Sequence, residues 1–229
     1  MKRSILTAIV AGAALSASAM GQASDPVIYD NGIAGLGNTG LSSQNDAVYP
    51  FDSQVADDFV LGANNVVTGV SWEGLYFNTP PGANATAFNI FFYADDGFGT
   101  GPAGGPGTEF ASAIIPVGSI QIIQPVPGVE NYSYSADLPA SVSIPSGTTT
   151  WIAIQAESVF PPQWGWDGLT QPGGNATQGF PLLGTPYWTT YDDGIGNGAE
   201  MDFVLHGVPA PASVALLGLG GLVATRRRR

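Results

Sequence analysis

Glycine and proline are spread through this chain so closely that they limit the folds open to it. They make up 32 and 18 of the 229 residues, and between the two ends no apolar stretch keeps helical spacing for long. Segments with alternating apolar residues are found instead, as expected for short strands separated by turns. We predict strands at residues 27–29, 55–61, 66–77, 87–93, 110–117, 119–123, 132–136, 149–156, 187–191 and 201–206.

This spacing of short strands predicts an all-β fold, an antiparallel two-sheet β-sandwich of jelly-roll type. Residues 149–155 show the alternation: Ile152 and Ile154 share one face, and Trp151, Ala153 and Gln155 share the other. We expect one side of this strand to lie in the core. The segments rich in turn residues, 33–46, 95–107 and 168–184, are predicted to be the mobile loops.

The basic residues of the chain all lie at its two ends. Lys2 and Arg3 stand near the start, residues 226–229 are four arginines, and all 18 Asp and Glu residues lie between them. The body therefore has a formal charge of −18, and its carboxylates must be solvated, hydrogen-bonded or neutralised by metal ions. Nucleic acid is excluded as an electrostatic partner, because nothing basic is present to neutralise phosphate.

The chain has no cysteine, so its stability must come from an ordinary core rather than from disulfides. The body has the size of one sandwich domain. We expect three parts: a signal peptide at residues 1–23, a β-sandwich ectodomain at 24–207 and a sorting tail at 208–229.

The first of these parts has the outline of a secretory signal peptide. Lys2 and Arg3 precede an apolar run at residues 5–17, and small residues follow. Cleavage fits after Ala19 and fits slightly better after Ala23. We expect signal peptidase to remove this segment, which forms a helix before its removal.

The last 22 residues have the pattern of a membrane anchor. Pro209 and Pro211 end the preceding structure, residues 212–225 carry no charge, and the four arginines follow. As a helix the uncharged stretch spans roughly 21 Å, short of the ~30 Å hydrocarbon core, so crossing needs local thinning or snorkelling arginines. The arginines favour a cytoplasmic C-terminus. The alternative, a buried terminal helix of the folded domain, would leave four arginines uncompensated.

A proline motif, an apolar stretch and an arginine cluster in this order resemble the PEP-CTERM sorting signal, which exosortases recognise in bacteria with an outer membrane. The matching residues are Val208, Pro209, Ala210, Pro211, residues 212–225, Arg226, Arg227, Arg228 and Arg229. Ala210 departs from the name-giving motif, which has Glu between the prolines. The resemblance implies an exosortase-type membrane protease or transpeptidase as a partner, transient anchoring in the inner membrane, and delivery to the cell surface or extracellular matrix.

The body resembles a recurrent β-sandwich ectodomain of such sorted proteins, most of which lack an assigned activity. The resemblance rests on loose motifs at residues 29–32, 55–61, 67–72, 91–96, 151–154 and 202–205. It implies an exported structural or interaction protein.

Three aspartate pairs stand beside expected turns: Asp57 and Asp58, Asp95 and Asp96, and Asp192 and Asp193. Ca²⁺ takes carboxylate and carbonyl oxygens, and an all-acidic body has reason to bind it. Aspartates also cap turns by accepting hydrogen bonds from backbone N–H groups. Both interpretations stay open, and Ca²⁺ is the one cofactor that the sequence suggests.

Aromatic residues gather in the last third of the chain: Trp164, Trp166, Tyr187, Trp188 and Tyr191. With Gln163 and Asp167 nearby, they fit a sugar-binding site in which rings stack on the sugar and polar groups bind its hydroxyls. Core aromatics of a sandwich give the same sequence pattern, so this assignment also stays open.

The sequence shows no catalytic constellation. The body lacks Cys, Lys and Arg, which excludes thiol catalysis and basic clamps, and its one histidine, His206, has no nucleophile elbow to pair with. We therefore expect a non-enzymatic surface or matrix protein. The alternatives are a carbohydrate-binding module, with extracellular polysaccharide as its partner, and a glycan hydrolase or lyase built on two carboxyls.

Overall fold

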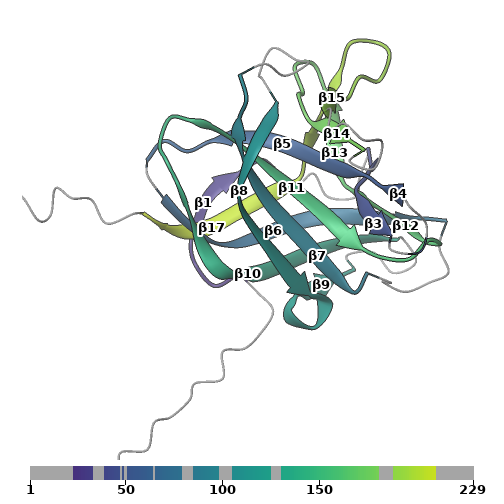
Figure 1. Ribbon diagram of the computed structural model, residues 1–229, viewed down its shortest axis with the longest axis horizontal. Coiled ribbons are helices and arrows are strands. Elements are labelled where there is room, and N and C mark those ends of the chain that lie inside the picture. The colour runs from purple at the N-terminus through teal and green to yellow at the C-terminus, as the bar shows by residue number, and fades with distance from the viewer. Residues whose placement is uncertain are drawn as a thin grey trace, which may run out of the picture.

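The structure is a computed structural model that describes residues 23–32, 39–46, 48, 51–63, 65–78, 85–97, 105–124, 130–180 and 188–209. Within these ranges the chain contains 17 strands, one turn of 3₁₀ helix at Val117–Ser119 and no α-helix. Antiparallel sheets pack in a sandwich-like arrangement (Figure 1), which confirms the predicted all-β class. The predicted signal-peptide and C-terminal helices lie outside the described residues. Among those described, no helix is long and apolar enough to cross a membrane.

The first sheet is built around β6 (Asn65–Phe77), whose two edges are used differently. One edge pairs with β10 (Asn131–Ile144). The other edge is divided between β17 (Phe203–Pro209), which pairs with β6 as far as Trp72, and β12 (Gln163–Trp166), which pairs with it from Gly74 onward. Glu73 therefore lies at the point where one neighbouring strand replaces the other. The sheet is completed by β1 (Val27–Asp30), β9 (Gln121–Ile123) and β2 (Leu41–Ser42).

The second sheet is built around β11 (Thr149–Glu157), which pairs antiparallel with β5 (Gln54–Val60) and β7 (Ala87–Asp95). It also includes β8 (Pro106–Pro116), β14 (Thr177–Gly179), β15 (Trp188–Thr190), β3 (Gln44–Asp46) and β4 (Phe51–Asp52). One pairing departs from the predicted antiparallel pattern, because β3 runs parallel to the end of β11. A separate two-stranded sheet joins β13 (Gly168–Gln171) to β16 (Gly198–Met201).

Aromatic rings fill the space between the two sheets. Trp72 of β6 stacks on Tyr134 of β10 with ring centroids 5.3 Å apart, and Phe88 of β7 meets Trp72 at 5.2 Å and Trp164 at 5.1 Å. Edge-to-face and offset ring pairs of this kind add to the apolar burial. The core is therefore held together by aromatic contacts from one sheet to the other.

The predicted strands are found at or near their expected positions, with two differences. The strand expected at residues 201–206 is divided at Asp202, which separates β16 from β17. The expected loops at 33–46 and 168–184 contain strands β2, β3, β13 and β14. The prediction of loops was wrong there because strands of two to four mostly polar residues carry too little alternation to be recognised, and their pairing partners lie far away in the chain.

The prediction that β11 has one side in the core is confirmed, and its other face is buried as well. Ile152 and Ile154 belong to the main core, whereas Trp151 and Ala153 pack on the opposite face in a second, smaller cluster. A central strand that is buried on both faces has a nearly continuous apolar sequence. In β11, Tyr93 packs on the face that carries Trp151 and Ala153.

The last strand runs beyond the predicted end of the folded domain. Val208 and Pro209, two residues of the expected sorting signal, belong to β17 and lie opposite Val66 and Asn65 of β6. Proline has no N–H to donate, and it is tolerated at the end of a strand. The remaining sorting-signal residues lie outside the described part of the chain.

Candidate functional site

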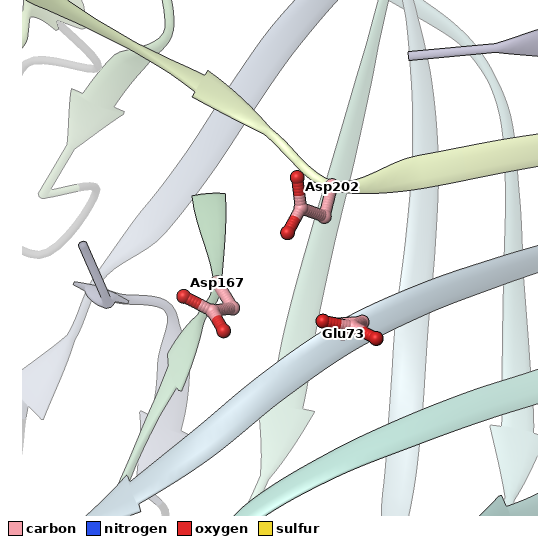
Figure 2. A group of neighbouring side chains, drawn as sticks. All are labelled: Glu73, Asp167 and Asp202. Atoms are coloured by element: carbon pink, nitrogen blue, oxygen red, sulfur yellow. The ribbon is translucent and has the colours of Figure 1, made fainter. Parts of the chain in front are cut away.

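Three acidic side chains converge where β12 and β17 meet beside β6 (Figure 2). Glu73 lies on β6, Asp167 connects β12 to β13, and Asp202 connects β16 to β17. Backbone hydrogen bonds tie the three segments together: Asp167 N donates to the Glu73 carbonyl at 3.0 Å, and Asp202 N donates to the Asp167 carbonyl at 2.9 Å. One carboxylate oxygen from each residue lies within 4.8 Å of the other two. We call these residues the carboxylate trio.

The carboxylate trio is shielded from water and has no basic side chain nearby in sequence to neutralise it. Glu73, Asp167 and Asp202 are 3%, 0% and 2% exposed, and no Lys or Arg occurs between residues 24 and 209. If all three were ionised, each pair would repel by roughly 3.5 kcal/mol for an effective dielectric constant of about 20. The three pairs together would approach the total stability of a typical domain, about 5–15 kcal/mol. The trio therefore needs either shared protons or a bound cation.

Neutral donors hold the carboxylates of the trio in place. Ser133 Oγ donates to Glu73 Oε1 at 3.0 Å, the backbone N–H of Gly168 donates to Asp167 Oδ1 at 2.9 Å, and Asn131 Nδ2 donates to Asp167 Oδ2 at 2.6 Å. These bonds orient the oxygens without supplying positive charge. Asn131 is only 4% exposed, and its side-chain oxygen Oδ1 accepts no hydrogen bond from the described residues.

Every side-chain ligand atom that the carboxylate trio offers is an oxygen. Carboxylate and amide oxygens suit hard cations such as Ca²⁺ and Mg²⁺, whereas zinc sites are mostly built from nitrogen and sulfur. The burial of all three carboxylates keeps a large substrate away from them. This arrangement can hold a small ion or protons, and it suits a structural centre better than a catalytic one.

The first predicted aspartate pair is divided between two environments. Adjacent residues of a strand point to opposite faces, so on β5 Asp57 is fully buried and Asp58 only partly. Asp57 Oδ2 accepts bonds from Met201 N at 2.7 Å and Asn31 Nδ2 at 3.0 Å. Burial, and then the charge of Glu200, raise the pKa of Asp57 well above its usual value. Burial also raises the pKa values of Asp58 and Glu200.

The second predicted pair lies where β7 ends. Asp95 Oδ1 accepts a hydrogen bond from Trp151 Nε1 at 3.1 Å, and the backbone N–H of Asp96 bonds the carbonyl of Gly105. The charge of Asp95 is a minor cause of the raised pKa of Asp58, and β11 lies between the two strands that carry these residues. The two hydrogen bonds above lead from this pair to a tryptophan side chain and a backbone carbonyl.

The third predicted pair caps a turn. Asp192 Oδ1 accepts from Gly194 N at 2.7 Å, and Asp193 Oδ1 accepts from Ile195 N at 2.9 Å and Asn197 N at 3.1 Å. These bonds lower the pKa of Asp193. The alternative of turn-capping aspartates thus describes this pair.

Two of the aromatic residues predicted as a sugar platform are core residues instead. Trp164 and Trp166 are both 0% exposed, so neither ring has a face that a sugar could reach. The two tryptophans lie on the same face of β12, between the sheets. There the Trp164 ring contacts Phe88, and the Trp166 ring contacts Phe203. Trp188 is partly buried against Tyr93. Tyr191 packs against the core cluster, and Tyr187 lies outside the described residues.

The carboxylate trio could not be recognised from the sequence, because its members are single acidic residues far apart in the chain. Each of them directly adjoins a buried aromatic residue: Trp72, Trp166 and Phe203 respectively. An acidic residue next to a buried aromatic, within a strand or directly at its end, was the signal present in the sequence. That signal does not show that the three strands meet.

A separate cleft opens between the end of β7 and the turn before β11. It has a volume of about 530 Å³ and is lined by Ala94, Asp95, Phe110, Ser143, Pro145, Thr148, Thr149 and Thr150. The Phe110 side chain is 47% exposed there. An accessible ring, a carboxylate and several hydroxyls are the groups that a sugar site uses.

Comparison with known protein families identifies a domain within the chain. The profile of a domain of unknown function, DUF7901, matches residues 35–190, which is more than half of the chain. That segment includes Glu73 and Asp167, whereas Asp202 and β17 follow it. No curated protein matches the chain.

Proposed function

Because the chain belongs to the DUF7901 family, whose description states no activity, we propose from its own residues that it is a non-catalytic structural or interaction protein of the cell surface or extracellular matrix. The observation that carries this proposal is the separation of charge along the chain. All six basic residues lie in the two end segments that have targeting patterns, and all 18 acidic residues lie in the body between them. Export through a signal peptide and sorting by an exosortase-type system account for both ends.

Two features of the fold support this proposal. The carboxylate trio is buried, so it offers no open pair of acids to a substrate. In addition, β17 pairs with both β1 and β6 and ends at Pro209, so the proposed sorting tail follows directly from the interior of a sheet. We further propose the jelly-roll form of the sandwich and the division into residues 1–23, 24–207 and 208–229, with the folded strand extending into the first residues of the tail.

Processing in a bacterium with an exosortase-type system tests the proposed function. The full-length chain should appear outside the inner membrane, with an N-terminus after Ala19 or Ala23 and without its C-terminal arginines. Replacing all four arginines at 226–229 by Ala should leave the protein uncleaved at its C-terminal end. The control variant Ala210→Glu restores the name-giving motif and should be sorted normally. An intact chain found in the cytoplasm would contradict the proposal.

The cleft beside β7 favours carbohydrate binding as a second candidate function. Phe110 provides a ring that a sugar can reach, and Asp95 with the Thr148 to Thr150 hydroxyls provides hydrogen-bonding partners. Binding to a glycan array by the full-length chain would support this function if Phe110→Ala abolishes it. Ile114→Ala is the matched control, because Ile114 is exposed on the same strand and does not line the cleft. Equal binding by both variants would exclude the cleft.

A further inference from the structure

We infer that the carboxylate trio, together with Asn131, is a Ca²⁺ site buried at the junction of β6, β12 and β17. The first support is that the backbone fixes all three carboxylates. The hydrogen bonds from Asp167 N to Glu73 O and from Asp202 N to Asp167 O hold the segments in register. Figure 2 shows the three side chains lying near one another. The fold therefore holds these oxygens close together.

The second support is independent of the acids and comes from Asn131. Asn131 is only 4% exposed, and its amide lies against the trio because Nδ2 donates a hydrogen bond to Asp167 Oδ2. Its oxygen Oδ1 has no hydrogen-bond partner among the described residues, which is costly for a buried polar atom. A half-turn of the amide exchanges Nδ2 and Oδ1 and presents an oxygen to a cation beside Asp167.

The third support is the charge of the surroundings. The part of the chain between residues 24 and 209 contains no Lys or Arg, so a salt bridge to those residue types cannot form there. The ring nitrogens of His206 are engaged with Ser71 Oγ at 2.9 Å and with the Asp25 carbonyl at 3.1 Å. A divalent cation would neutralise two of the three carboxylate charges at once.

The geometry favours Ca²⁺ over Mg²⁺. Ca²⁺ accepts six to eight oxygens in irregular arrangements, whereas Mg²⁺ needs a near-ideal octahedron and usually keeps several waters. At exposures of 0% to 3%, the trio offers little access to bulk water. Its carboxylates can each bind through one or both oxygens, which fits the more adaptable ion.

Tb³⁺ binding by the full-length chain tests the inference directly. Tb³⁺ occupies oxygen sites of Ca²⁺ size, and its emission is sensitised by nearby tryptophan. Trp72 and Trp166 are the sequence neighbours of Glu73 and Asp167. We expect one saturable Tb³⁺ site with tryptophan-sensitised emission, displaced by Ca²⁺ and only weakly by Mg²⁺. Absence of sensitised emission in the wild-type chain would overturn the site.

Matched variants assign the bound ion to these residues. Asp202→Asn should weaken Ca²⁺ binding by roughly tenfold or more, and Asn131→Ala should weaken it without a change of charge. The control Asp192→Asn makes the same chemical change on an exposed turn and should bind like the wild type. Normal binding by folded Asp202→Asn would overturn the assignment. If circular dichroism shows that this variant does not fold, Glu73→Gln and Asn131→Ala decide the question in the same way.

Discussion

The substitution Asp202→Asn should stabilise the metal-free protein and lose much of that advantage when Ca²⁺ is added. The carboxamide has nearly the shape of the carboxylate, and it brings an N–H₂ group that can donate to Glu73 or Asp167. When a chelator keeps the protein free of metal, the substitution removes a buried carboxylate that lies within 4.8 Å of two others. The variant should therefore be more stable than the wild-type protein when no metal is present.

The size of this effect follows from the geometry of the carboxylate trio. Removing both pairs that involve Asp202 relieves up to roughly 7 kcal/mol if all three acids are ionised. Proton uptake limits that repulsion, so we expect a gain of about 1–4 kcal/mol, a fraction of that upper bound. A change of 1 kcal/mol moves the unfolding midpoint by about 2–4 °C in a domain of this size. The metal-free variant should thus unfold several degrees above the wild type.

Calcium should narrow that gap. At a Ca²⁺ concentration of about one hundred times the wild-type dissociation constant, the wild-type protein gains about 2.7 kcal/mol, whereas Asp202→Asn, whose affinity is at least tenfold weaker, gains at most about 1.4 kcal/mol. The assay is thermal unfolding of both proteins in chelator, in Ca²⁺, and in NaCl of equal ionic strength. The NaCl sample separates charge screening from Ca²⁺ binding, because screening alone should shift the midpoint equally in both salts. An equal Ca²⁺ shift in the two proteins would refute the reasoning. So would a variant that is destabilised in chelator.

Three further predictions concern the rest of the fold. Burial holds the pKa values of Asp57 and Glu200 above their unfolded values, so the native state binds more protons than the unfolded state. Urea unfolding midpoints should therefore fall as pH rises through the raised pKa values. Asp57→Asn should make this dependence on pH weaker. Trp166→Ala should cost about 3–5 kcal/mol in urea unfolding, because Trp166 is a core residue; a near-neutral result would contradict that position. Gly168→Ala would press a Cβ against the Glu200 carbonyl oxygen and should cost about 1–3 kcal/mol in urea unfolding, whereas Gly118→Ala meets nothing within 4 Å and should be neutral.

The fold class could be predicted from the sequence because its long strands carry their own pattern. The segments at residues 66–77 and 149–156 alternate over enough residues to be recognised without knowledge of their partners. β2, β3 and β14 could not be recognised, since they are two or three residues long and form only against distant strands. The double burial of β11 depends on Trp188 and Tyr93, which come from elsewhere in the chain.

The candidate site could be predicted only in its chemistry. An all-acidic body raises the question of how its carboxylates are neutralised, and the sequence directed attention to the adjacent aspartate pairs rather than to single acids. Neighbours in a strand face opposite ways, so Asp57 and Asp58 separate, whereas Glu73, Asp167 and Asp202 meet only because β12 and β17 share one edge of β6. Such a meeting is a property of the topology and has no local trace in the sequence.

The most direct test of the buried Ca²⁺ site is a crystal structure of the full-length protein grown with Tb³⁺ in place of Ca²⁺, with the ion located by its anomalous scattering. We predict one strong peak between the carboxylates of Glu73, Asp167 and Asp202, with the Asn131 side-chain oxygen turned toward it. A trio without a peak, whose oxygens are close enough to share protons, would contradict the account. A peak at Asp192 and Asp193 instead would move the metal to the turn and contradict it equally.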